Sequence, residues 1–240
     1  MLFNYQRIMK LVLFIASLLL ACTQHITESD MVVSPGNTTS KYSFLSLGDS
    51  YTIGESVSEA DRWSVQLAGM LRKDSVDVAN PDIIARTGWT TSQLQNAITA
   101  SGNEKTYSFV SLLIGVNNQY QGQNQDRYRS EFRELLRTAT KFAGDKASRV
   151  FVLSIPDWGA SPYGAQNNKV KIAQEIDQFN AIAKEECQKA NIAYVDITPL
   201  TRSANGDNAQ FADDGLHYSG KQMRTWAEKA MPTVKELLKK

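Results

Sequence analysis

Short apolar runs alternate with longer amphipathic segments along the chain from residue 42 onward. The runs at 109–114 and 149–155 contain too few polar residues for a strand with one wet face, so they predict strands buried within a sheet. Repeated alternation of strand and helix predicts a three-layer α/β/α sandwich, in which helices cover both faces of a central parallel sheet. We expect strands at 42–47, 76–78 with 83–85, 109–114, 149–155 and 192–196, and helices at 63–71, 91–100, 126–143, 169–190 and 220–239.

The first part of the chain has a different pattern. Residues 1–21 carry Arg7 and Lys10 ahead of an apolar run, which is typical of an export signal and too short for a comfortable membrane span. The run ends in Leu-Leu-Ala-Cys at 19–22, which resembles a bacterial lipobox and predicts lipid chains on Cys22. An ordinary cleaved signal, with Cys22 incidental, is the alternative. Residues 22–40 are polar and predict a flexible tether, so we expect an exported protein anchored by lipid to a membrane of the bacterial cell envelope.

Composition narrows the class of protein that follows the tether. The chain has 240 residues, of which 42% are hydrophobic and 21% charged, and this is ordinary for one globular domain, here placed at 41–240. Its formal net charge is +1, and no basic stripe points to nucleic acid. Cys187 is the only cysteine besides Cys22, so we expect no internal disulfide and a small core residue at Cys187.

A candidate nucleophile follows the first predicted strand. The run ends abruptly at Gly48-Asp49-Ser50, which places Ser50 at the edge where open α/β sheets bind ligands. A serine needs a base, most often a histidine oriented by a carboxylate. His217 is the only histidine outside the tether, and Asp214 precedes it by three residues, close enough to hold its ring. Each of these residues taken singly also fits an ordinary turn, cap or packing position.

Attack on an ester carbonyl builds negative charge on oxygen, which aimed hydrogen-bond donors stabilise. The backbone N–H groups of Ser50 and Gly88 and the side-chain amide of Asn117 are the donors available at the ends of predicted strands. Gly88 and Asn117 also have a simpler interpretation as turn formers.

Four stretches, 48–50, 86–88, 115–118 and 214–217, resemble in order the blocks of the SGNH (GDSL-type) hydrolase family of lipases and esterases. The resemblance covers nearly all of 42–240 and implies a flavodoxin-like sheet and ester hydrolysis without a cofactor. It also implies that Ser50 is the nucleophile, that Asp214 and His217 are orienter and base, and that Ser50, Gly88 and Asn117 form the oxyanion hole. Two positions depart from the family pattern: Tyr51 replaces a leucine, and Asn118 replaces an aspartate, which removes a charge from that loop.

The substrate stays open at the level of the sequence. Trp158 and Tyr163 lie in a loop after a predicted strand and are candidates to line an acyl or sugar pocket, or simply to pack on the domain. A membrane tether slightly favours lysophospholipid or other lipid esters, and acetylated glycans are the nearest alternative. Two alternative functions involve no catalysis. The chain could be a surface lipoprotein that binds glycan or lipid, or a structural anchor of an envelope complex. No cluster has metal-ligand spacing, and no glycine-rich phosphate loop is present.

Overall fold

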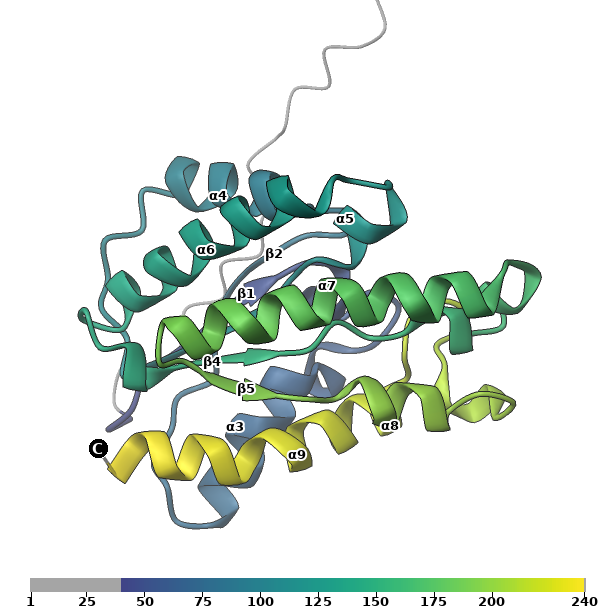
Figure 1. The fold of residues 1–240 in the computed structure, drawn as a ribbon. Coiled ribbons are helices and arrows are strands. Elements are labelled where there is room, and N and C mark those ends of the chain that lie inside the picture. Colours follow the sequence, from purple (N-terminus) through teal and green to yellow (C-terminus); the bar gives the residue numbers. More distant parts are fainter. Residues whose placement is uncertain (1–39, 240) are drawn as a thin grey trace, which may run out of the picture. The chain divides into compact units, whose positions relative to one another are not determined.

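The computed structural model describes residues 40–239. The predicted export signal, Cys22 and the tether up to residue 39 lie outside the described residues. Within them, five strands form one parallel sheet in the order β2-β1-β3-β4-β5, which is the flavodoxin-like order (Figure 1). The strands are β1 (Phe44–Gly48), β2 (Asp82–Ala85), β3 (Phe109–Leu113), β4 (Val150–Leu153) and β5 (Ala193–Val195).

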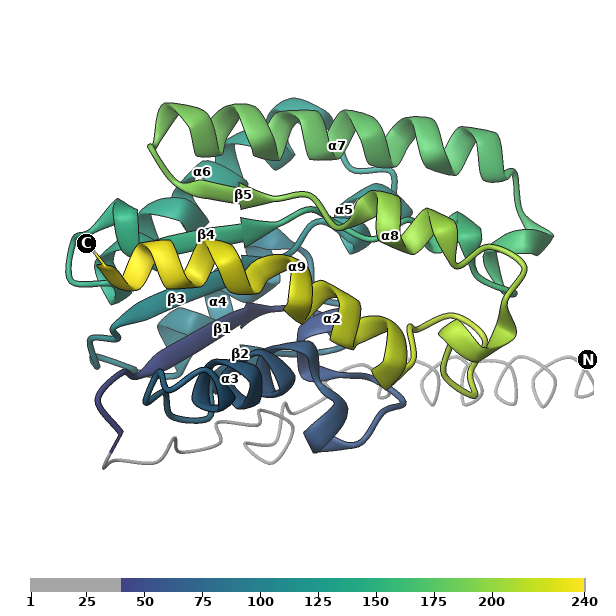
Figure 2. The ribbon, with the colours of Figure 1, turned by 90° about the horizontal axis from the view of Figure 1, so that it is seen from below.

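Helices cover both faces of the sheet, as the alternating pattern predicts (Figures 1 and 2). One face carries α3 (Trp63–Lys73) and α9 (Gly220–Lys239), which pack on each other. The other face carries α4 (Thr91–Ala100), α6 (Gln125–Phe142) and α7 (Lys169–Lys189). Short helices follow three strands directly at their carboxyl ends: α2 (Ser50–Ile53), α5 (Val116–Tyr120) and α8 (Thr198–Ser203). Single 3₁₀ turns occur at Glu59–Asp61, Ala147–Arg149, Trp158–Ala160, Gly164–Gln166 and Asn208–Gln210.

Stacked aromatic rings join the three central strands on the face that α3 covers. Phe44 of β1 stacks on Phe109 of β3 with ring centroids 4.4 Å apart, and Phe151 of β4 lies 6.5 Å from Phe109. Trp63 of α3 meets Phe151 edge to face. All four rings are buried, so the centre of the sheet is a rigid apolar support for the loops at its carboxyl edge.

One predicted strand is shorter than expected. Val78 makes only an isolated bridge with Tyr42, and β2 begins at Asp82, after Pro81. A proline cannot donate to a ladder, which separates the two pieces that the sequence pattern joins. The bounds of the other strands agree with the predicted ranges to within two residues at each end.

The segment that leads into the sheet and the candidate nucleophile lie at opposite ends of β1. Residues 40–43 precede β1, at the amino ends of the strands, whereas Ser50 follows its carboxyl end. Cys187 is fully buried in α7, as expected for a small core residue. Across residues 40–239, none of the helices combines the length and the apolar character needed to span a bilayer.

Candidate active site

Ser50 is the first residue of α2 and follows β1 after a single intervening residue. Asp49 caps this helix, and its Oδ1 accepts a hydrogen bond from the Tyr51 N–H at 3.1 Å. The turn requires glycine at position 48, because a Cβ there would lie 2.5 Å from the carbonyl oxygen of Leu113. Ser50 is only 4% exposed, so its surroundings are largely shielded from water.

Gly54 ends α2. It adopts a left-handed conformation with φ 74°, and a Cβ there would lie 2.6 Å from Cγ of Arg62, in the segment that follows. The segment after Gly54 thereby turns away from the helix and across the edge of the sheet.

Asp214 and His217 form a hydrogen-bonded pair in a loop closed by the bridge between Phe211 and Tyr218. The distance from Nδ1 of His217 to Oδ2 of Asp214 is 2.6 Å, and Oδ1 accepts the N–H groups of Leu216 at 2.8 Å and His217 at 2.9 Å. The imidazole meets the ring of Tyr51 edge to face with centroids 5.5 Å apart, so the pair lies against the residue that follows Ser50.

The hydrogen bonds around Asp214 fix its protonation state. Partial burial opposes its ionisation, but donors from Ser56, the Leu216 backbone and His217 outweigh that effect and hold the pKa of Asp214 well below its ordinary value. An ionised carboxylate can only accept, so Nδ1 of His217 carries the proton. In the neutral imidazole, Nε2 is therefore the nitrogen without a proton, the one that can act as a base.

Glu55 and Ser56, which follow α2, form hydrogen bonds with the segments that carry Gly88 and His217, and no sequence motif marks them. Ser56 Oγ donates to Oδ2 of Asp214 at 2.7 Å, and Glu55 accepts a hydrogen bond from the hydroxyl of Thr87. Their partners lie far away in the chain, in the stretches that hold Gly88 and His217. A polar turn in the sequence gives no indication of such long-range pairing.

The structure gathers the predicted oxyanion donors on the same edge. Gly88 lies in an exposed turn with φ 83°, next to Trp89. Asn117, in the first turn of α5, donates one amide proton to the Trp89 carbonyl at 3.0 Å. This bond holds the Gly88 turn and Asn117 together and leaves the second amide proton of Asn117 free to serve another acceptor.

Asn118, where the family pattern has an aspartate, keeps its loop in place through hydrogen bonds. Its side chain is fully buried, its Oδ1 accepts the Thr91 N–H at 3.1 Å, and its Nδ2 donates to the Thr91 hydroxyl at 2.6 Å. The amide thus fastens α5 to the start of α4 without a charge.

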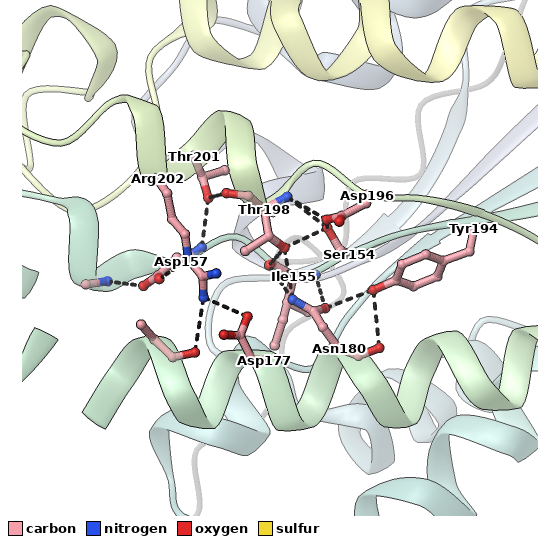
Figure 3. Close-up of polar contacts among 12 residues, drawn as sticks. Ser154, Ile155, Asp157, Asp177, Asn180, Tyr194, Asp196, Thr198, Thr201 and Arg202 are labelled. Carbon is pink, nitrogen blue, oxygen red and sulfur yellow. Dashed lines mark hydrogen bonds and ion pairs between the residues drawn. The ribbon is translucent and has the colours of Figure 1, made fainter. Parts of the chain in front are cut away.

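A polar network fixes the loop that follows β4 (Figure 3). The Asp157 carboxylate accepts hydrogen bonds from Arg202 Nε at 2.8 Å and from the Gly159 N–H at 3.0 Å. Tyr218, next to His217, donates its hydroxyl proton to the Asp157 carbonyl at 2.7 Å. The loop that carries His217 is therefore hydrogen-bonded to a segment that is itself held in place by hydrogen bonds. The residues labelled in this network are Ser154, Ile155, Asp157, Asp177, Asn180, Tyr194, Asp196, Thr198, Thr201 and Arg202.

The two aromatic candidates of this loop differ in exposure. Trp158 is only 6% exposed, and its indole N–H is bonded to Oε1 of Gln119 at 2.8 Å, so it mainly packs between loops. Tyr163 is 41% exposed, and its hydroxyl lies 3.2 Å from that of Tyr120, which is 56% exposed. The Tyr163 N–H donates to the Gly215 carbonyl at 2.9 Å. The two tyrosines thus connect the Asn117 helix with the histidine loop.

Tyr120 also lines a cleft of about 350 Å³. Trp158 lines its wall, and most of the remaining lining is polar. The polar lining residues are Gln119, Asn167, Asn168, Lys171 and Glu175.

Asp49 places a buried carboxyl directly beside the nucleophile. Its Oδ2 has no hydrogen-bond partner within the described part of the chain, and burial raises the pKa of the carboxyl to about 7. Over residues 40–239, no group of three or more histidine, cysteine, aspartate or glutamate side chains is arranged to hold a metal ion.

Comparison with solved structures gives the same fold at low sequence identity. The crystal structure of TesA superposes with a TM-score of 0.65 at 17% identity, covering 82% of this chain and 99% of that one. The esterase EstA from Pseudoalteromonas sp. gives a TM-score of 0.64 at 14% identity, covering 83% and 100% of the two chains. The acetylxylan esterase Axe2 from Geobacillus stearothermophilus gives 0.64 at 15% identity, covering 81% and 94%.

Sequence comparison assigns the family. A search of curated protein sequences gave no significant match. The profile of the GDSL-like Lipase/Acylhydrolase family matches residues 46–224, a span that begins in β1 and ends in α9. It includes the Ser50 turn, the Asn117 helix and the Asp214–His217 loop, so the chain belongs to the GDSL-like lipase/acylhydrolase family.

Proposed function

We propose that the chain hydrolyses carboxylic esters through an acyl-serine intermediate. Ser50 Oγ attacks the ester carbonyl while Nε2 of His217 takes its proton, and His217 then gives this proton to the leaving alcohol. Water, deprotonated by His217, releases the acyl group from Ser50. Asp214 holds the imidazole throughout and stabilises it when it is charged.

The observation that carries this proposal is the 2.6 Å pairing of Asp214 with His217 beside the helix that Ser50 begins. The pair comes from the end of the chain and the serine from its beginning, and only folding brings them to one edge of the sheet. Membership in an acylhydrolase family supports the same reaction class.

We assign the oxyanion to three donors: the backbone N–H groups of Ser50 and Gly88, and the free amide proton of Asn117. The bond from Asn117 to the Trp89 carbonyl supports this assignment, since it holds the amide beside the turn that carries Gly88. Donors fixed before the reaction need no reorganisation when charge develops.

The direct test is covalent labelling of the full-length protein by a fluorophosphonate, which reacts with an activated serine. We expect labelling of the folded wild type and none of Ser50→Ala with an unchanged thermal midpoint. A folded wild type that neither reacts nor hydrolyses any ester would instead favour the non-catalytic binder of glycan or lipid.

Two ester classes compete as substrates. Attachment to a membrane through Cys22, which we also propose, favours lysophospholipid or other lipid esters. The exposed Tyr120–Tyr163 pair and the polar side chains of the cleft that Tyr120 lines favour an acetylated glycan, because sugars bind through aromatic faces and side-chain hydrogen bonds. The acetylxylan esterase of similar fold acts on such an ester, which supports the second candidate.

A panel of p-nitrophenyl esters from acetate to palmitate, together with lysophospholipid and acetylated xylan, separates the two classes. A glycan esterase should prefer acetate and acetylated xylan, and Tyr163→Ala should raise KM for xylan more than for p-nitrophenyl acetate. Preference for palmitate and lysophospholipid would assign lipid esters instead.

A further inference from the structure

Ser56 makes an unusual contact for an exposed turn residue. Its hydroxyl lies 2.7 Å from Oδ2 of Asp214, the same oxygen that faces Nδ1 of His217. Asp214 is ionised, so the Ser56 hydroxyl is the donor. The bond links the loop behind the nucleophile with the loop of the acid and base, across 158 residues of sequence.

Ser56 completes the hydrogen bonding of the carboxylate. An ionised carboxylate has about four acceptor positions. Two backbone N–H groups occupy Oδ1, and the imidazole and Ser56 occupy Oδ2. The Asp214 side chain is 31% exposed, so without Ser56 a mobile water molecule would take the fourth position.

The backbone at Ser56 is held in a conformation that serine rarely adopts. Its φ is 63°, in the left-handed region that favours glycine. Glycine would be the less strained residue here, but it has no hydroxyl to donate. Ser75 has the same φ, so what distinguishes Ser56 is the bond that its hydroxyl makes to Asp214.

We propose that Ser56 is a positioning residue of the reaction, which fixes the Asp214 carboxylate and, through it, the orientation of the His217 imidazole. Ser56 itself touches neither the substrate nor the proton in transfer. The bond joins the two halves of the site, so the imidazole stays aligned with Ser50 as its charge changes during the reaction.

Ser56→Gly is the sharpest variant, because it removes the hydroxyl and relieves the backbone strain at the same time. We expect kcat on p-nitrophenyl acetate to fall about tenfold with KM changed by less than about twofold, as for loss of a bond that acts in the transition state. The thermal midpoint should stay equal or rise. An unchanged kcat, or a rise in KM alone, would overturn the proposal.

The chain supplies a matched control in Ser75. This serine is also exposed and also has φ 63°, but it follows α3, away from the site. Ser75→Gly changes the unfolded chain and the backbone strain in the same way, and it should leave kcat unaltered. Equal losses of kcat in the two variants would mean a general effect of glycine and would refute a specific role for Ser56.

Ser56→Asn should restore most of the activity. Asparagine tolerates the left-handed conformation, and its amide can donate to the carboxylate. We expect kcat within about threefold of wild type, consistent with the modest worth of a single exchanged hydrogen bond. A variant as slow as Ser56→Gly would show that the hydrogen bond is not what matters.

The inference rests on the proposed ester hydrolysis, so a second measurement is independent of turnover. The Nδ1 proton of His217 is hydrogen-bonded to Asp214 and so protected from exchange with water. It should give a downfield NMR signal in the full-length wild type. Faster exchange of this proton with water in Ser56→Gly, and not in Ser75→Gly, is the expected result. Identical exchange in both variants would overturn the positioning role even in a chain that hydrolyses no ester.

Discussion

Asn117 uses only part of its hydrogen-bonding capacity within the folded chain. One amide proton is engaged with the Trp89 carbonyl, and the other is available to a developing oxyanion. We expect Asn117→Ala to lower kcat by about 100-fold or more with little change in KM, as loss of an oxyanion donor should. Steady-state kinetics on p-nitrophenyl acetate measures both constants, and an unaltered kcat would remove Asn117 from the mechanism.

Asp49 is expected to make the folded state less stable as pH rises. Its pKa is raised to about 7 by burial, above an ordinary value near 4 in the unfolded chain. The folded chain therefore binds its proton more tightly, and stability is lost as the pH passes from about 4 to about 7. In Asp49→Asn, which can keep the cap of α2, the thermal midpoint should fall less between about pH 5 and about pH 8 than in wild type. The same decrease in both proteins would show that Asp49 does not titrate in this range.

At the scale of elements, a buried carboxylate joins α6 to α7. The Glu186 side chain on α7 is 2% exposed and accepts hydrogen bonds from Arg129 Nη1 and Arg133 Nε of α6, both at 2.7 Å. These bonds, chiefly the one from Arg133, lower the pKa of Glu186 to about 2. The stabilisation is therefore present above about pH 4 and is lost as pH falls towards 2.

We expect Glu186→Gln to lower the thermal midpoint by about 5 °C at neutral pH, because it leaves two arginines without their buried partner. The difference from wild type should shrink as pH approaches about 3. Glu185→Gln is the matched control, since its side chain is 47% exposed although it also contacts Arg129. Its effect should be much smaller, and equal effects would argue against a special role of burial.

The elements themselves follow closely from the hydrophobic pattern. The long helices α6, α7 and α9 match their predicted ranges to within one residue, because many turns of amphipathic sequence fix their ends. The interruption at Pro81 does not follow from the pattern, since the short polar stretch around it is flanked by apolar residues at 78–79 and 83–85. Ser56 could not be predicted from the sequence, because its partner is 158 positions away. The packing of Trp158 was equally open, as an aromatic loop residue has the same sequence signature whether it packs or binds.

The membrane anchor that we propose lies outside the described part of the chain. Cys22 stands at the end of the predicted export signal, and we propose that it carries lipid. Cys22→Ser should then release the protein from the membrane fraction, measured by fractionation and by loss of palmitate labelling. Membrane association that persists without acylation would refute the lipoprotein assignment.

The position of residues 40–43 at the amino ends of the strands has a consequence for such an anchor. Any attachment through the preceding residues would join the domain at the amino ends of the strands. β1 alone separates that end from the carboxyl end, which Ser50 follows, by roughly 17 Å. Ser50 would then lie at the end of the domain opposite the point of attachment. Soluble or polymeric esters could diffuse directly to Ser50. A lipid in the bilayer could reach Ser50 only after it left the membrane or after the domain rotated on its tether.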